Sequence, residues 1–157
     1  MRIHLDMPRF MPTPDRVDPT QLAQLGKMLK MAEREGIYLD ITGLACYRVA
    51  DVPKWYDALD EQHRWAIQAK FWAAVAEQCK NSPAVFCYDL MNEPFGQIRP
   101  GETLFTAAER VESQQLTPMY QRITDAISAV NADHWVFIEP PNLASLGVST
   151  SLGKVTG

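Results

Sequence analysis

Short apolar runs alternate with longer amphipathic stretches along most of the chain, and this alternation limits its fold more than any other feature. Strands that alternate with helices in this way are typical of βαβ units around a parallel sheet. The 157 residues suffice for one such domain, and no shift in composition marks a boundary inside it. The predicted strands lie near residues 2–7, 37–42, 84–91 and 135–138, and the predicted helices cover 19–36, 61–80 and a segment that ends near residue 130.

The first predicted strand has one polar face. Arg2, His4 and Asp6 occupy alternate positions, so their side chains share that face. A polar face is unusual for a strand of a buried sheet unless the face lines a site. His4 and Asp6 could suggest a metal site, but the sequence has no second histidine cluster to complete one. We therefore expect no bound metal.

The net charge and the hydropathy exclude two classes of partner. Fifteen Lys and Arg stand against nineteen Asp and Glu, a formal charge of −4, so the chain lacks the basic field that nucleic acids require. No apolar run reaches the roughly 18 residues of a membrane-spanning helix, and the first residues lack the apolar stretch of a signal peptide. We expect a soluble protein that binds neither nucleic acid nor membrane, and its compartment stays open.

The three cysteines lack the two-residue spacing of a zinc or redox motif. A free cysteine most often behaves as a small buried hydrophobic residue. We expect this for Cys46, Cys79 and Cys87.

The tripeptide Asn92-Glu93-Pro94 is the sharpest chemical signal, because it follows a predicted parallel strand. Ligands of parallel α/β folds gather at the carboxyl ends of the strands. A carboxyl group there, next to an amide that can bond a sugar hydroxyl, suits proton transfer to a glycosidic oxygen. The plainer interpretation is that Glu93 and Pro94 only turn the strand into a loop.

The longer string from Tyr88 to Pro94, with Arg2 on an earlier strand and Asp-Ile-Thr-Gly at 40–43, resembles glycoside hydrolase family 5, the cellulases and their relatives. The resemblance implies retaining glycosidases built on an eight-stranded (β/α) barrel. It implies an α/β fold here, a partial (β/α)8 TIM barrel with roughly strands 2 to 5 and the helices between them. Residues 1–157 would form a single partial catalytic domain, without the first strand and strands 6 to 8.

Carried over residue by residue, the resemblance makes Glu93 the acid/base and Asn92 the ligand of the sugar 2-hydroxyl. Arg2 looks like the family's second-strand arginine, which holds the nucleophilic carboxylate ionised. One departure concerns the histidine that usually ends the third strand. Thr42 and Gly43 stand in its place, so a substrate contact is missing or replaced.

Further residues are expected to contact a carbohydrate substrate. Tyr47 or His4 would replace the missing histidine, and Trp55, Tyr56 and Tyr47 would be available to stack on sugar rings. The alternative for the aromatic residues is that they pack their loop onto the barrel. The resemblance implies no cofactor.

The family's nucleophile ends the seventh strand, which is absent from this chain. Glu139 ends the strand directly after that of Glu93, whereas the family's nucleophile faces the acid/base from across the barrel mouth, so we expect Glu139 to line the site or support it. The isolated chain is expected to be inactive, and its open half-barrel leaves sheet edges available for self-association.

Two other interpretations stay open. The chain could be a non-catalytic half-barrel that at most binds carbohydrate. A small doubly wound domain would need a glycine-rich phosphate loop after its first strand, and residues 7–10, Met-Pro-Arg-Phe, do not provide one.

Overall fold

The structure, a computed structural model, describes residues 1–45, 52–94, 98–130, 133–141 and 147–157. Its strands form one sheet in the order β1-β2-β3-β4, and all three neighbouring pairs are parallel. The strands are β1 (Arg2–His4), β2 (Leu39–Ala45), β3 (Val85–Asn92) and β4 (Trp135–Phe137). The parallel α/β architecture predicted from the alternating pattern is therefore confirmed.

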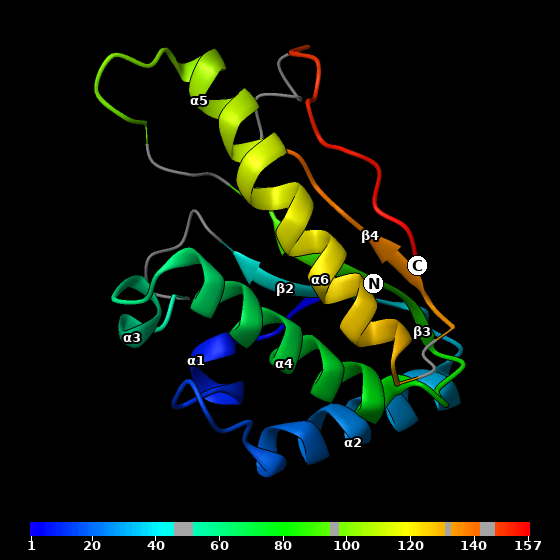
Figure 1. The fold of residues 1–157 in the computed structure, drawn as a ribbon. Coiled ribbons are helices and arrows are strands. Elements are labelled where there is room, and N and C mark those ends of the chain that lie inside the picture. The colour runs from blue at the N-terminus through cyan, green and yellow to red at the C-terminus, as the bar shows by residue number, and fades with distance from the viewer. Residues whose placement is uncertain (46–51, 95–97, 131–132, 142–146) are drawn as a thin grey trace.

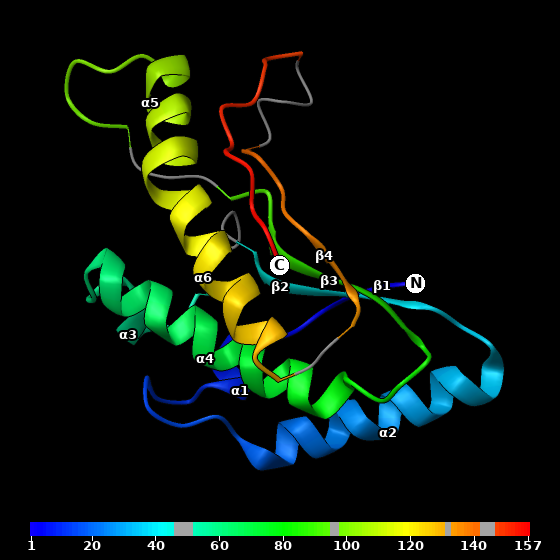
Figure 2. The ribbon, with the colours of Figure 1, turned by 45° about the vertical axis from the view of Figure 1, so that its right-hand side comes forward.

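The connections between strands are helical, and the three long helical segments lie on the same side of the sheet (Figures 1 and 2). This placement is the one expected when consecutive parallel strands are joined by right-handed crossovers. The helices are α1 (Met7–Phe10), α2 (Pro19–Glu35), α3 (Lys54–Asp57), α4 (Glu61–Cys79), α5 (Leu104–Arg110) and α6 (Thr117–Ser128), with a π-helical segment, η2 (Val111–Leu116), before α6.

Local sequence signals define the ends of α2 and α4. The carboxylate of Asp18 accepts a hydrogen bond from the Thr20 amide at 2.7 Å, and Gly36 ends α2 in the left-handed conformation at φ 66°. Asp60 caps α4 in the same way by accepting from the His63 amide at 2.9 Å. The predicted helices over 19–36 and 61–80 are thus confirmed almost to the residue.

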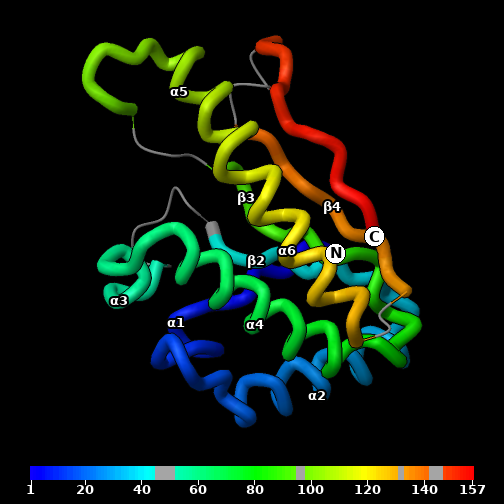
Figure 3. The backbone as a smooth tube through the Cα atoms, viewed as in Figure 1, coloured from blue at the N-terminus to red at the C-terminus, as the bar shows by residue number. Residues whose placement is uncertain are grey.

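The third helical segment is one continuous rod from α5 through η2 into α6, as the tube in Figure 3 shows. Its start follows Thr103, whose hydroxyl accepts from the Thr106 amide at 3.2 Å in a reciprocal capping box. Pro118 lies in the first turn of α6, where it lacks an amide hydrogen for the helix. The wider π turn precedes it, so the rod continues past the proline.

The main core lies between the sheet and these helices. Trp72 of α4 is fully buried and contacts Phe71 and Tyr88 edge to face, with ring centroids 5.4 and 5.8 Å apart. Gly43 allows this packing, because a Cβ there would lie 2.6 Å from both the Leu90 carbonyl oxygen and the Trp72 ring. The strand predicted near residues 37–42 does not end before the glycine. Strand β2 runs from Leu39 to Ala45, with Gly43 inside it at this close approach.

The opposite face of the sheet is open. Trp135 and Phe137 of β4 are 70% and 44% exposed, and Phe86 of β3, which contacts Phe137 edge to face, is 48% exposed. None of the described helices is both long and apolar enough to cross a membrane. The chain after residue 147 runs along α6, where Gln121 bonds the backbone of Thr156 (Figure 1).

Candidate active site

A cluster of charged side chains occupies the open face of the sheet, around Arg2. The Arg2 guanidinium donates to the Thr42 hydroxyl at 2.9 Å and to the Glu139 carboxylate at 2.7 Å. It also donates to the carboxylate of Asp89 and lies 3.6 Å from that of Asp40. Each of the four strands, or the residues just after it, therefore contributes to one ionic cluster. It borders an open cleft of about 360 Å³.

Asp89 is the most perturbed member of this cluster. Its side chain is only 4% exposed, and one of its oxygens has no hydrogen-bond partner among the described residues. Burial, and secondly the charge of Glu139, raises the pKa of Asp89 to about 7, although Arg2 opposes the shift. Neither Asp89 nor Asp40 was predicted from the sequence to be a site residue. Their signal is an acidic residue inside an otherwise apolar strand.

The predicted acid/base segment lies at the carboxyl end of β3, beside the cluster. Asn92 is the last residue of the strand and is buried, whereas Glu93 is exposed. Glu93 is the only described residue other than glycine with a positive φ, at 44°. Its backbone amide donates to the Glu139 carboxylate at 2.8 Å. The structure thus brings the Glu93 backbone, Glu139 and Arg2 together.

His4 and Trp55 are the other predicted site residues that the structure describes. His4 is exposed at the end of β1, in register with Thr42. Trp55 is half-buried in α3, where it packs against the core and contacts the Tyr56 ring edge to face at 6.0 Å. Tyr47 lies outside the described residues. For Trp55, the packing role that the sequence left open is therefore the one that the structure supports.

The two described cysteines are buried, as expected. Burial raises the pKa of the Cys79 thiol to about 12, and burial together with the Asp40 charge does the same for Cys87. Thiols with such pKa values are protonated and inert at neutral pH. Cys46 lies outside the described residues.

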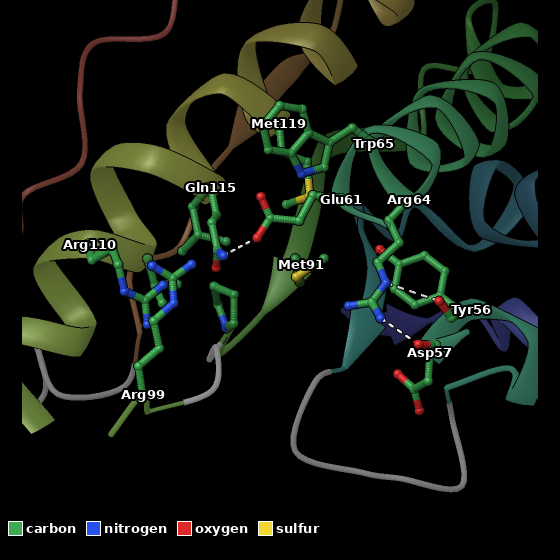
Figure 4. Close-up of a pocket in the computed structure, with 13 residues that line it drawn as sticks. Tyr56, Asp57, Glu61, Arg64, Trp65, Met91, Arg99, Arg110, Gln115 and Met119 are labelled. Carbon is green, nitrogen blue, oxygen red and sulfur yellow. Dashed lines mark hydrogen bonds between the residues drawn. The ribbon is translucent and has the colours of Figure 1, made fainter. Parts of the chain in front are cut away.

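A second cavity, of about 410 Å³, lies behind the end of β3 between α4 and the α5–α6 rod (Figure 4). Apolar side chains line part of it, and Pro94, which directly follows Glu93, is among the lining residues. Arg110 on its rim pairs with Glu102 at 2.5 Å, and Arg64 donates to the Tyr56 and Asp57 carbonyls. The apolar lining residues are Trp65, Met91, Pro94, Val111, Leu116 and Met119.

Comparisons with known proteins agree with this architecture. The family model described as Cellulase (glycosyl hydrolase family 5) matches residues 1–154. An endoglycoceramidase of Hydra vulgaris is 34% identical over 54% of this chain and 16% of its own length. An endoglucanase of Paenibacillus polymyxa is 26% identical over 80% of this chain and 29% of its own. The chain thus spans less than a third of either curated relative.

Among solved structures, the endo-glycoceramidase II of Rhodococcus sp. in complex with ganglioside GM3 superimposes on 99% of this chain with a TM-score of 0.83. The identity is 22%, and 44% of that chain is covered. A likeness at this identity concerns the fold. The four parallel strands and their helices therefore correspond to part of a (β/α)8 barrel.

Proposed function

The chain belongs to glycosyl hydrolase family 5, and from this premise we propose that it is part of an O-glycosyl hydrolase that cleaves its substrate by a retaining double displacement. Residues 1–157 would be one partial catalytic domain that holds strands 2 to 5 of the barrel. The chain would supply the acid/base of the reaction. The nucleophile would come from a strand outside it.

One observation carries this proposal: the Asn92-Glu93 pair ends a parallel strand beside the Arg2 cluster. Glu93 is exposed at the carboxyl end of β3, where ligands of parallel α/β folds bind. Its neighbour Asn92 can bond a sugar hydroxyl through its amide. A lone carboxylate at a strand end would be weak support, but here Glu139, which is bonded to Arg2, accepts a hydrogen bond from the Glu93 amide.

The chemistry assigned to Glu93 has two parts. In the first step its carboxyl group protonates the glycosidic oxygen as the leaving group departs and the nucleophile attacks the anomeric carbon. In the second step the Glu93 carboxylate takes a proton from water, which hydrolyses the glycosyl-enzyme. A retaining pair stands about 5–5.5 Å apart. Arg2 and Glu139 line an open cleft of about 360 Å³.

The substrate we propose is a carbohydrate, either a cellulose-like polysaccharide or a smaller glycoside. The names of the relatives include both an endoglucanase and an endoglycoceramidase. The cavity behind β3 supports an aglycone with an apolar part, because Pro94, the residue after Glu93, lines it together with other apolar side chains. Hydrolysis of a lactosyl lipid, compared with that of a cello-oligosaccharide, distinguishes the two substrates.

Self-association of the isolated chain is also proposed, since β1 and β4 end the sheet and Trp135 and Phe137 are exposed. The competing function is a half-barrel that binds carbohydrate without cleaving it. Turnover of an aryl glycoside by the purified 157-residue chain would contradict the proposal that the nucleophile comes from outside this chain.

The test of the function is Glu93→Gln in the eight-stranded enzyme that carries this segment. With substrates whose leaving groups need protonation, we expect a loss of about 10²–10⁴-fold in kcat/KM, the usual contribution of a general acid. With a dinitrophenyl glycoside the bond-breaking step should hardly change, because that leaving group needs no proton. Glu109→Gln on the exposed side of α5 is the matched control. An equal loss for both classes of substrate would remove Glu93 from this role.

A further inference from the structure

Glu139 uses both oxygens of its carboxylate on two different partners. Oε1 accepts from the Arg2 guanidinium at 2.7 Å, and Oε2 accepts from the backbone amide of Glu93 at 2.8 Å. The Glu139 backbone is itself tied to the helix layer, because its carbonyl accepts from the Tyr120 hydroxyl at 2.9 Å. Tyr120 is fully buried, so this end of the contact is fixed.

The partner amide belongs to a residue with a strained backbone. Glu93 has φ 44°, a region that costs a residue with a Cβ about 1–2 kcal/mol. Such a conformation persists only where its surroundings hold it. A hydrogen bond from an amide to a carboxylate is about twice as strong as a neutral one. Glu139 therefore stabilises the backbone conformation from which the Glu93 side chain projects.

Arg2 extends this support to the centre of the sheet. It is bonded to Thr42 of β2 and to Asp89 of β3 as well as to Glu139. The buried Asp89 side chain cannot move without breaking its contact with Arg2. The row Asp89, Arg2, Glu139 and the Glu93 amide thus links three strands to one peptide group.

We propose that Glu139 is a positioning residue, which with Arg2 fixes the backbone of Glu93 and so the direction of its carboxyl group. The catalytic meaning of this inference rests on the proposed function, whereas the contact itself does not. Both oxygens of Glu139 are engaged within the site, one with Arg2 and one with the Glu93 amide. Its role is to act through Glu93.

Glutamine is the informative substitution. Glu139 accepts a hydrogen bond in both contacts, with one oxygen for each. A glutamine side chain has only one acceptor oxygen. Glu139→Gln therefore keeps the shape of the side chain but must lose either the Arg2 contact or the Glu93 contact, or weaken both. Glu109→Gln removes one negative charge from the exposed surface of α5 and serves as the control.

The experiment is NMR-detected hydrogen exchange of the full 157-residue chain, observed at the Glu93 amide. In the unsubstituted chain this amide should be protected, because it donates to the Glu139 carboxylate. In Glu139→Gln hydrogen exchange at the Glu93 amide should be about tenfold faster or more. Glu109→Gln should leave the exchange rate unchanged.

The results separate this inference from the proposed function. A Glu93 amide that keeps its full protection in Glu139→Gln overturns the positioning role, whatever Glu93 does in catalysis. If the variant does not fold, hydrogen exchange in the unsubstituted chain decides alone, and a Glu93 amide without protection overturns the role. If exchange at the Glu93 amide depends on Glu139 but the kinetics of Glu93→Gln are unchanged, the contact is supported and the acid/base function of Glu93 is rejected.

Discussion

The two faces of the sheet differ in composition, although the same strands build both. On the helix side, Gly43 and Tyr88 meet Trp72 in a closed apolar layer. On the open side, Arg2 and Asp89 belong to an ionic cluster beside exposed aromatic residues. Because strand side chains alternate between faces, one sequence pattern encodes both environments. We infer that the helix side provides most of the stability and the open side the chemistry.

The largest expected effect comes from the closed face. Trp72→Ala should destabilise the chain by about 3–5 kcal/mol, since it leaves a cavity under the sheet and frees the Leu90 carbonyl that accepts from the indole at 3.3 Å. Trp135→Ala, on the open face, should change the free energy of unfolding by less than about 0.5 kcal/mol. Urea unfolding followed by circular dichroism measures both. Equal losses would contradict the division between the faces.

Gly43 tests how tightly the closed face is packed. Gly43→Ala places a methyl group 2.6 Å from both a backbone oxygen and the Trp72 ring, so a loss of about 1–3 kcal/mol is expected. Gly26→Ala is the counterpart in α2, where the new Cβ meets only the end of the flexible Gln78 side chain. That variant should gain up to about 1 kcal/mol, because alanine favours a helix. The midpoints of urea unfolding compare the two, and similar values would mean that the close approach at Gly43 is absent.

Asp89 gives the ionic face a pH dependence of its own. Its pKa is raised by burial from 3.8 to about 7 in the folded state, where Glu139, Arg2 and Asp40 act on it. The folded chain then binds the proton more tightly than the unfolded chain, so this stability is present below pH 4 and is lost as pH rises toward 7. From pH 5 to 7 the loss amounts to about 2 kcal/mol.

An asparagine at position 89 does not ionise. The free energy of unfolding of Asp89→Asn should therefore not fall by this amount between pH 5 and 7. Asp15→Asn, at an exposed position, should keep this fall. Unfolding in urea at several pH values in that interval makes the comparison. A slope that survives in Asp89→Asn would assign the pH dependence to another group.

The smallest effect on stability is expected for the exposed aromatic residues of the open face. Phe137→Ser should change the free energy of unfolding by less than about 0.5 kcal/mol, because Phe137 is 44% exposed. It should nevertheless weaken self-association of the isolated chain. Phe105→Ser, a similar change on α5, should not. Sedimentation velocity distinguishes the two, and no difference between them would place the association elsewhere.

The sequence predicted the elements better than the contacts between them. Asp18 and Gly36 mark the ends of a helix by local chemistry, so those ends were predicted correctly. The end of β2 was not, because the reason for Gly43 is the ring of Trp72, which lies 29 positions later in the chain. Only the fold brings the two together.

In the candidate site, too, the sequence predicted residues but not the contacts between them. The motif identified Glu93 and Asn92, and the resemblance identified Arg2. Neither indicated that Glu139 bonds the Glu93 amide, since that contact joins the ends of two strands and depends on their register. A long-range contact of this kind has no local signal in the sequence.

The central claim is that Glu93 acts in both steps of a retaining hydrolysis. The most direct measurement is mass spectrometry of Glu93→Ala, in the enzyme that carries this segment, during reaction with a dinitrophenyl glycoside. The first step needs little acid help with that leaving group, whereas the second lacks its base, so a covalent glycosyl-enzyme should accumulate. No adduct, together with turnover as fast as that of the unsubstituted enzyme, would contradict the claim.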